Sequence, residues 1–107
     1  METQHKNLAD EKWFKMTLSE QLGNVGSEYG RAWQWRGKNR LEYADKAFDR
    51  MLELLDLTIE DPRWQNHRLK ELLRLREQAC EEYFIPDKHS TLSKYLNQFA
   101  LAARLNR

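Results

Sequence analysis

Four apolar stripes, each repeating at intervals of three or four residues, constrain the fold of this chain more than any other feature. An α-helix presents the same face at that spacing, so each stripe predicts one amphipathic helix. The chain has only 4 Gly and 2 Pro, too few turn residues for a small sandwich or barrel. The four stripes are Phe14, Leu18, Leu22, Val25, Tyr29 and Ala32; Leu41, Ala44, Phe48, Met51, Leu55 and Thr58; Leu69, Leu72, Leu73, Arg76, Ala79, Cys80 and Tyr83; and Leu92, Leu96, Phe99, Ala103 and Leu105.

Capping residues set the expected ends of the first two helices. Thr17 and Glu20 have the spacing of a capping box, in which each side chain bonds to the other residue's backbone amide, so the first helix should begin there. Gly37 is expected to end that helix in a left-handed conformation. Asn39 is expected to cap the second helix, with Glu42 three residues later.

The two prolines set the later boundaries. Asp61 caps well and proline suits the first helical turn, so the third helix is expected to start at Pro62. It should end before Ile85 and Pro86, and the fourth helix should follow Ser90.

Connections of about 2 to 6 residues make neighbouring helices antiparallel, which favours an all-α, up-down-up-down four-helix bundle. A three-helix bundle with a docked terminal helix is the second possibility. At 107 residues the chain has room for one domain, expected over residues 13–107 behind a loose tail over residues 1–12. Trp13, Phe14 and Met16 are expected to form an ordered lead-in that packs on the bundle.

Charge and composition argue against several classes of protein. The net charge of +1 gives no global field to steer nucleic acid or an anionic membrane. No apolar run approaches the roughly 20 residues of a membrane span, and the first ten residues lack the apolar core of a signal peptide. A single cysteine, Cys80, argues against a disulfide framework and a multi-cysteine zinc site. We therefore expect a cytoplasmic protein with no membrane association.

The second helix carries a line of carboxylates that could collect a metal ion, pair with a neighbouring helix or form a solvated face. Pairing is favoured, because carboxylate-bridged metal bundles need Glu-x-x-His pairs, and that spacing occurs only at Glu2 and His5, in the expected tail. Arg76, inside the third apolar stripe, must also pair with a carboxylate or extend its guanidinium into solvent. The acidic line is Glu42, Asp45, Asp49, Glu53, Asp56 and Glu60, and the line expected to pair with it is Arg63, His67, Lys70 and Arg74.

Enzymatic chemistry has few candidate residues. The three histidines, His5, His67 and His89, do not lie opposite an obvious nucleophile, and no glycine-rich phosphate loop follows a strand. We therefore expect no catalytic residues, no cofactor and no metal.

A strip of small residues follows the first helix. Gly23, Gly26 and Gly30, with Ser19 and Ser27, are spaced by about one turn, so another backbone can approach closely there. Three helical glycines are hard to explain otherwise, since each costs roughly 0.5–1 kcal/mol relative to alanine. The approaching element could be a helix of the same bundle, or a partner or second subunit; a helix broken at these glycines is the remaining possibility.

The segment 29–40 contains cations and rings without an acidic residue. Cations bind phosphates and rings stack on bases, but tryptophan is also enriched in protein interfaces. Trp33 and Trp35 lie about 200° apart around a helix, so at most one faces the core. Glu28 and Arg31 lie at i and i+3, where they can pair. The candidate partner-binding or nucleic-acid-binding residues are Arg31, Trp33, Trp35, Arg36, Lys38 and Arg40.

Four short runs between Trp13 and Asp61 carry a resemblance: Glu20-Gln21-Leu22, Gly26-Ser27-Glu28, Lys46-Ala47-Phe48 and Leu54-Leu55-Asp56-Leu57-Thr58. With these runs the chain resembles a group of short bacterial helical-bundle proteins without an assigned activity. More remotely, the architecture is similar to the four-helix accessory proteins of bacterial reverse-transcriptase elements and ribosomal-RNA intervening sequences. That resemblance implies oligomers that associate with nucleic acid, and it carries over no site residues.

These observations lead to one expected function and one alternative. The protein is expected to be a non-catalytic interaction or assembly subunit. It should self-associate, or bind a protein partner, through the first helix and the 29–40 turn. The alternative is an RNA- or DNA-binding accessory protein.

Overall fold

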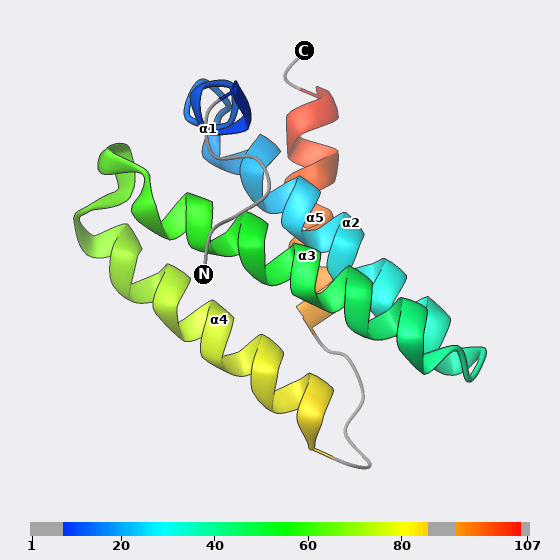
Figure 1. The fold of residues 1–107 in the computed structure, drawn as a ribbon. Helices are drawn as coiled ribbons and strands as arrows, with labels where there is room; N and C mark the ends of the chain where they lie inside the picture. Colours follow the sequence, from blue (N-terminus) through cyan, green and yellow to red (C-terminus); the bar gives the residue numbers. More distant parts are fainter. Residues whose placement is uncertain (1–7, 86–91, 106–107) are drawn as a thin grey trace.

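The computed structural model describes residues 8–85 and 92–105, and this part of the chain is helical throughout apart from short connections (Figure 1). The all-α prediction is therefore confirmed for the described ranges. The elements are α1 (Leu8–Trp13), α2 (Leu18–Gly37), α3 (Leu41–Glu60), the 3-10 turn η1 (Pro62–Trp64), α4 (His67–Phe84) and α5 (Leu92–Leu105). Ser90, the expected start of the last helix, lies outside the described residues. No helix in the described part combines the length and apolarity needed to cross a membrane.

The capping box at the start of α2 is present as predicted. The backbone amide of Glu20 donates to Thr17 Oγ1 at 3.1 Å, and the amide of Thr17 donates to Glu20 Oε1 at 2.9 Å. Both amides would otherwise lack a partner inside the helix. The first turn of α2 is therefore stabilised by residues three positions apart.

The turn between α2 and α3 differs from the prediction at two positions. Gly37 is the last residue of α2 but does not take a positive φ; Asn39 does, at 59°. Arg40, not Asn39, occupies the N-cap position of α3, and its side chain makes no capping bond to described residues. Asparagine tolerates the left-handed conformation better than other residues with a Cβ, so it makes the reversal that glycine was expected to make.

The boundary at Asp61 and Pro62 is a helix end followed by a 3-10 turn, so the predicted start of the third helix was wrong. Asp61 Oδ1 accepts from the amide of Arg63 at 3.0 Å, which tightens the chain into η1. The long helix α4 begins only at His67, where Asn66 accepts from the amide of Arg68 at 2.8 Å. Asp61 was correctly identified as a cap, but it caps the single 3-10 turn η1 and not a long helix.

The core lies around α2, which packs most extensively on α3 and α5, while α4 packs on α3. Figure 1 shows α2, α3 and α4 reversing direction one after another. The up-down-up-down four-helix arrangement is not confirmed, because a groove separates α4 from α5. The largest fully buried apolar side chains are Tyr29, Phe48, Met51, Leu55, Leu96 and Val25.

The expected tail over residues 1–12 is helical from Leu8 onwards, so that part of the prediction was wrong; residues 1–7 lie outside the described ranges. Trp13 ends α1 and is buried, and its Nε1 donates to Thr58 Oγ1 on α3 at 3.1 Å. Phe14 and Met16 pack against the core as well. Burial of the Trp13 ring explains why the chain is ordered before α2 begins.

Candidate functional site

Asp61, a fully buried carboxylate, belongs to a network of structural hydrogen bonds. Its carboxylate accepts from Arg63 Nη2 at 2.7 Å and from Gln21 Nε2 at 3.0 Å. Burial alone would raise the pKa of Asp61, but the bonds from Arg63 and Gln21 outweigh it and hold the pKa below its ordinary value. Asp61 is therefore a charged, fully engaged group at pH 7.

The same network connects α1, α2 and η1. Gln21 Nε2 also donates to the carbonyl of Trp13 at 2.9 Å, and Gln21 Oε1 accepts from Trp64 Nε1 at 2.8 Å. Arg63 Nη2 donates to the carbonyl of Met16 at 2.6 Å. These bonds satisfy the buried polar atoms, so the network stabilises the fold.

Arg36, expected to be a binding cation, lies in the contact between α2 and α4. Its Nη1 donates to the carbonyl of Tyr83, and its guanidinium lies 5.0 Å from the centroid of the Trp33 ring and 4.9 Å from that of Tyr83. A guanidinium stacked on two rings has little surface left for a phosphate. The structure therefore gives Arg36 a structural role.

Arg31 is also engaged within the molecule. Its Nη1 lies 2.6 Å from Glu28 Oε1, so the expected i, i+3 pair is present, and Arg50 Nη1 lies 3.7 Å from the other oxygen of Glu28. Because Glu28 is buried, both cations help to compensate its charge.

The two tryptophans of the segment have different surroundings. The Trp33 ring packs edge-on against Tyr29 at 6.3 Å and Tyr83 at 6.0 Å, and its Nε1 has no partner among the described residues. The Trp35 ring lies 5.0 Å from that of Tyr43, which is 49% exposed. Both tryptophans are half-buried and pack against the core; Trp33 lies among core rings, whereas Trp35 lies beside the exposed Tyr43.

An exposed surface remains at the α2–α3 turn. Lys38 Nζ lies 5.4 Å from the centroid of the Trp35 ring, and Arg40 is exposed beside it. Leu41, expected in the core, is 55% exposed because it lies at the first position of α3, beyond the end of α2. We call this set, Trp35, Lys38, Arg40, Leu41 and Tyr43, the turn surface.

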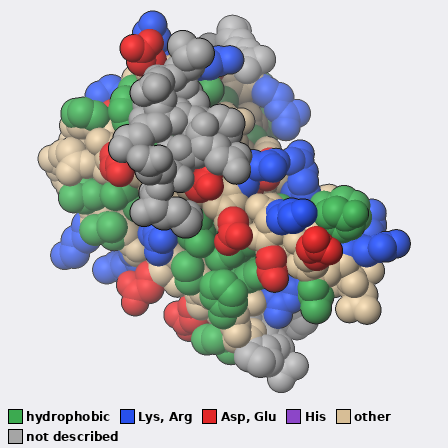
Figure 2. All heavy atoms as spheres, viewed as in Figure 1, with side chains coloured by type: hydrophobic (Ala, Val, Ile, Leu, Met, Phe, Trp, Pro, Cys, Tyr) green, Lys and Arg blue, Asp and Glu red, His purple; other side chains and the backbone are tan. Residues whose placement is uncertain are grey.

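Leu41 and Tyr43 of the turn surface were missed by sequence reasoning. Tyr43 lies on α3 and faces Trp35 only after the chain has reversed at Asn39. In the sequence its one signal is an aromatic residue outside the apolar stripe of its helix. In the view of Figure 2, Lys and Arg side chains lie beside hydrophobic ones at the right-hand edge of the molecule, and acidic side chains lie along its middle.

The small-residue strip of α2 faces α5 at two of its three glycines. A Cβ on Gly23 would lie 2.9 Å from Ala100 Cα, and a Cβ on Gly26 would lie 2.7 Å from Leu96 Cβ. Gly30 differs, since apart from its own stretch of helix nothing in the described chain lies within 4 Å of its would-be Cβ, and the expected close contact there was wrong because α5 does not approach it. The helix that uses this strip belongs to the same chain.

An ion pair between α3 and α4 uses Asp56 of the acidic line and Arg76, which lies outside the expected basic line. Arg76 Nε lies 2.8 Å from Asp56 Oδ1, so Arg76 pairs with a carboxylate of α3 as expected. Tyr83 donates to Asp45 at 2.8 Å, and burial together with that carboxylate raises the pKa of Tyr83. The expected pairing of α3 with Arg63, His67, Lys70 and Arg74 was wrong: Arg63 pairs with Asp61, and the other three line a groove towards α5.

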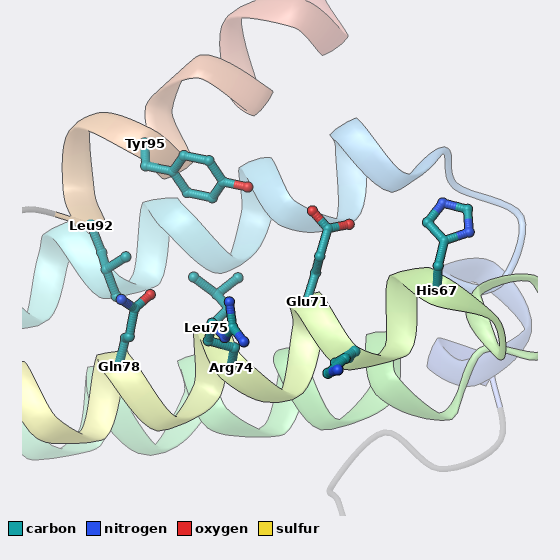
Figure 3. Close-up of a pocket in the computed structure, with 8 residues that line it drawn as sticks. His67, Glu71, Arg74, Leu75, Gln78, Leu92 and Tyr95 are labelled. Atoms are coloured by element: carbon teal, nitrogen blue, oxygen red, sulfur yellow. The ribbon is translucent and has the colours of Figure 1, made fainter.

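The groove between α4 and α5 has a volume of about 590 Å³. Figure 3 shows side chains from both helices around it, with Tyr95 extending from α5 over Leu75 of α4. The sequence signal that could have found it is the line of His67, Lys70 and Arg74 beside the apolar stripe of the same helix. The lining residues are His67, Lys70, Glu71, Arg74, Leu75, Gln78, Leu92 and Tyr95.

Within residues 8–85 and 92–105, no group of three or more His, Cys, Asp and Glu side chains could hold a metal ion. Comparison with protein-family models, with curated proteins and with solved structures found no match to this chain.

Proposed function

We propose that the protein is a non-catalytic assembly subunit that self-associates through the turn surface. The observation that carries this proposal is the Trp35 and Tyr43 ring pair, whose centroids lie 5.0 Å apart with Tyr43 half exposed. Leu41 extends the apolar area beside it. Exposed tryptophan and tyrosine side chains provide most of the energy at many protein interfaces.

Charge favours a second copy of the chain as the partner. Lys38 and Arg40 have no carboxylate within 4.0 Å among the described residues. Asp49 is exposed on α3, along the acidic line that starts next to the turn. In a two-fold interface, the cations of each turn can face the α3 carboxylates of the other copy, and each contact occurs twice.

The first helix contributes less to this proposal than its sequence suggested. Gly23 and Gly26 contact α5 of the same chain, so the strip is already occupied. The proposed interface therefore uses only the end of α2 and the start of α3.

An RNA- or DNA-binding role remains the alternative. Lys38 beside the Trp35 ring is the observation that favours it, because single-stranded nucleic acids bind surfaces with stacked rings and cations. Arg31 and Arg36 are engaged within the molecule, and the α3 carboxylates repel phosphate. These contacts support a protein partner over nucleic acid.

Two further parts of the proposal have separate support. The Asp61 network is assigned no catalytic role in this proposal, because its polar groups are engaged in structural bonds. A cytoplasmic location is supported by the single cysteine, Cys80, which is unpaired and packs against the core.

Sedimentation equilibrium of the full chain tests the proposed self-association. Wild type should be dimeric, and Tyr43→Ala should weaken the dimer by about 2 kcal/mol, roughly thirtyfold in dissociation constant. Tyr95→Ala, at a similarly exposed tyrosine on α5, should leave the dimer intact. Lys38→Glu should weaken the dimer and Lys38→Glu with Asp49→Lys should restore it.

Two results would reject this function. One is a monomer at every concentration tested. The other is tight binding of a mixed-sequence single-stranded RNA that falls steeply as salt rises and is lost in Lys38→Glu, which would establish the alternative.

A further inference from the structure

The groove between α4 and α5 has an apolar base and an exposed tyrosine on one wall. Leu75 and Leu92 are buried at its base, and Tyr95 is 44% exposed on its α5 wall (Figure 3). A smaller hollow shares Glu71, Leu75 and Tyr95 with the groove, and its lining includes the core residues Leu22 and Leu72. The apolar base therefore extends inward to the core.

The groove has the length and periodicity of a helix-binding site. Its α4 wall contributes one or two residues from each turn between His67 and Gln78. At 1.5 Å per residue this wall is about 16 Å long. A partner helix lying along it can place side chains at i, i+3 or i+4, and i+7 into the apolar base.

The distribution of polar groups distinguishes a protein partner from a small molecule. His67, Lys70, Arg74 and Gln78 are all exposed at the rim. Small-molecule sites hold convergent polar groups in their interior, whereas an apolar centre within a polar rim is typical of a protein interface. Among the described residues the buried polar side-chain atoms without a hydrogen bond belong to Glu28 and Trp33, and neither lines the groove.

Charge at the rim selects the chemistry of the partner. Lys70 and Arg74 have no carboxylate within 4.0 Å among the described residues, and Glu71 is held by Arg68 at 3.5 Å. The rim is therefore positive where a partner would pass. A second copy cannot supply α3 as that partner, because the apolar stripe of α3 is buried in its own core at Met51 and Leu55.

We propose that this groove binds an acidic amphipathic helix from another protein. The apolar face of that helix would cover Leu75, Leu92 and Tyr95, and its flanking carboxylates would pair with Lys70 and Arg74. The site is independent of the turn surface, which lies on α2 and α3.

The test uses two fluorescein-labelled peptides of about 18 residues, above the length at which isolated helices are marginal. Both carry leucines on one helical face; one has flanking Glu and the other flanking Lys at the same positions. Fluorescence anisotropy with the full chain should show the acidic peptide binding at least about tenfold more tightly. Lys70→Glu with Arg74→Glu should weaken that binding at least about tenfold, and Tyr95→Ala should weaken it several-fold.

The control for the charge change is Lys12→Glu with Lys46→Glu, at two exposed cations that do not line the groove. It should leave binding within about twofold of wild type. Circular dichroism checks that all variants stay helical, and amide NMR shifts on adding the acidic peptide should centre on His67, Leu92 and Tyr95. Tyr43→Ala should not change binding, so loss of self-association and loss of groove binding are separate results.

Several outcomes would overturn the proposal. These are no binding of the acidic peptide, equal binding of the two peptides, or NMR shifts centred away from the groove. Displacement of the peptide by mixed-sequence single-stranded RNA would show that the cations of the rim bind nucleic-acid phosphates. If the Lys70→Glu with Arg74→Glu variant were monomeric where wild type is dimeric, the groove would be assigned to a second copy of the chain.

Discussion

Gly26 of α2 and Leu96 of α5 lie so close that a Cβ built on Gly26 would be 2.7 Å from Leu96 Cβ. Leu96 is buried, so it has little space to move away. The close approach of α5 to α2 therefore depends on the missing side chain at this position, and the same relationship recurs at Gly23 against Ala100.

Replacing Gly26 with Ala should lower the free energy of unfolding by about 1–2 kcal/mol, because overpacking outweighs the gain in helix propensity. Gly30→Ala is the matched control in the same helix. It should raise the free energy of unfolding by roughly 0.5–1 kcal/mol, since apart from its own stretch of helix nothing in the described chain lies near the added methyl group. Urea denaturation measures both, and equal effects would contradict the close packing of α2 on α5.

The Asp61 carboxylate should contribute to stability in a pH-dependent way. Its pKa is lowered in the folded state, so the contribution is present above its ordinary value of 3.8 and is lost as pH falls towards the folded pKa. Asp61→Asn should reduce the free energy of unfolding by about 2 kcal/mol at pH 7. Denaturation at a series of pH values should show this difference narrowing below pH 3.8; a difference independent of pH would contradict the ion pair with Arg63.

Arg36 should matter for folding rather than for binding nucleic acid. Arg36→Ala removes the contacts with the Trp33 and Tyr83 rings and the bond to the Tyr83 carbonyl, and it should reduce the free energy of unfolding by about 1–3 kcal/mol. Arg40→Ala, at an exposed cation of the same turn, should change it by less than about 0.5 kcal/mol. Thermal unfolding followed by circular dichroism compares the two, and similar melting temperatures would count against the structural role.

The two tryptophans should differ in what they affect. Trp33→Ala should lower the free energy of unfolding by about 3–5 kcal/mol, since its ring packs between Tyr29 and Tyr83. Trp35→Ala should lower the free energy of unfolding by a smaller amount than Trp33→Ala does, and it should weaken self-association. Urea denaturation and sedimentation equilibrium on both variants test this division; a stable, monomeric Trp33→Ala protein would reverse it.

Short-range features of this protein were predictable from its sequence. The capping box joins Thr17 and Glu20, three residues apart, so its bonds form wherever that helix forms. The helical stripes and the end of α3 before Pro62 are equally local. The start of α4 was missed because η1 is tightened by Asp61, whose carboxylate is itself held by Gln21, 40 residues earlier in the chain.

The candidate sites depended on contacts between distant segments. Gly26 and Gly30 look alike in the sequence, but only Gly26 meets α5, because two crossing helices approach closely over a short length. Arg36 and Arg40 look alike too, but Tyr83, which engages Arg36, lies 47 residues further along the chain. The groove exists because α4 packs on α3 while α5 packs on α2. Helical periodicity determines which face of each helix is apolar, whereas side-chain packing between helices decides which parts of those faces stay exposed.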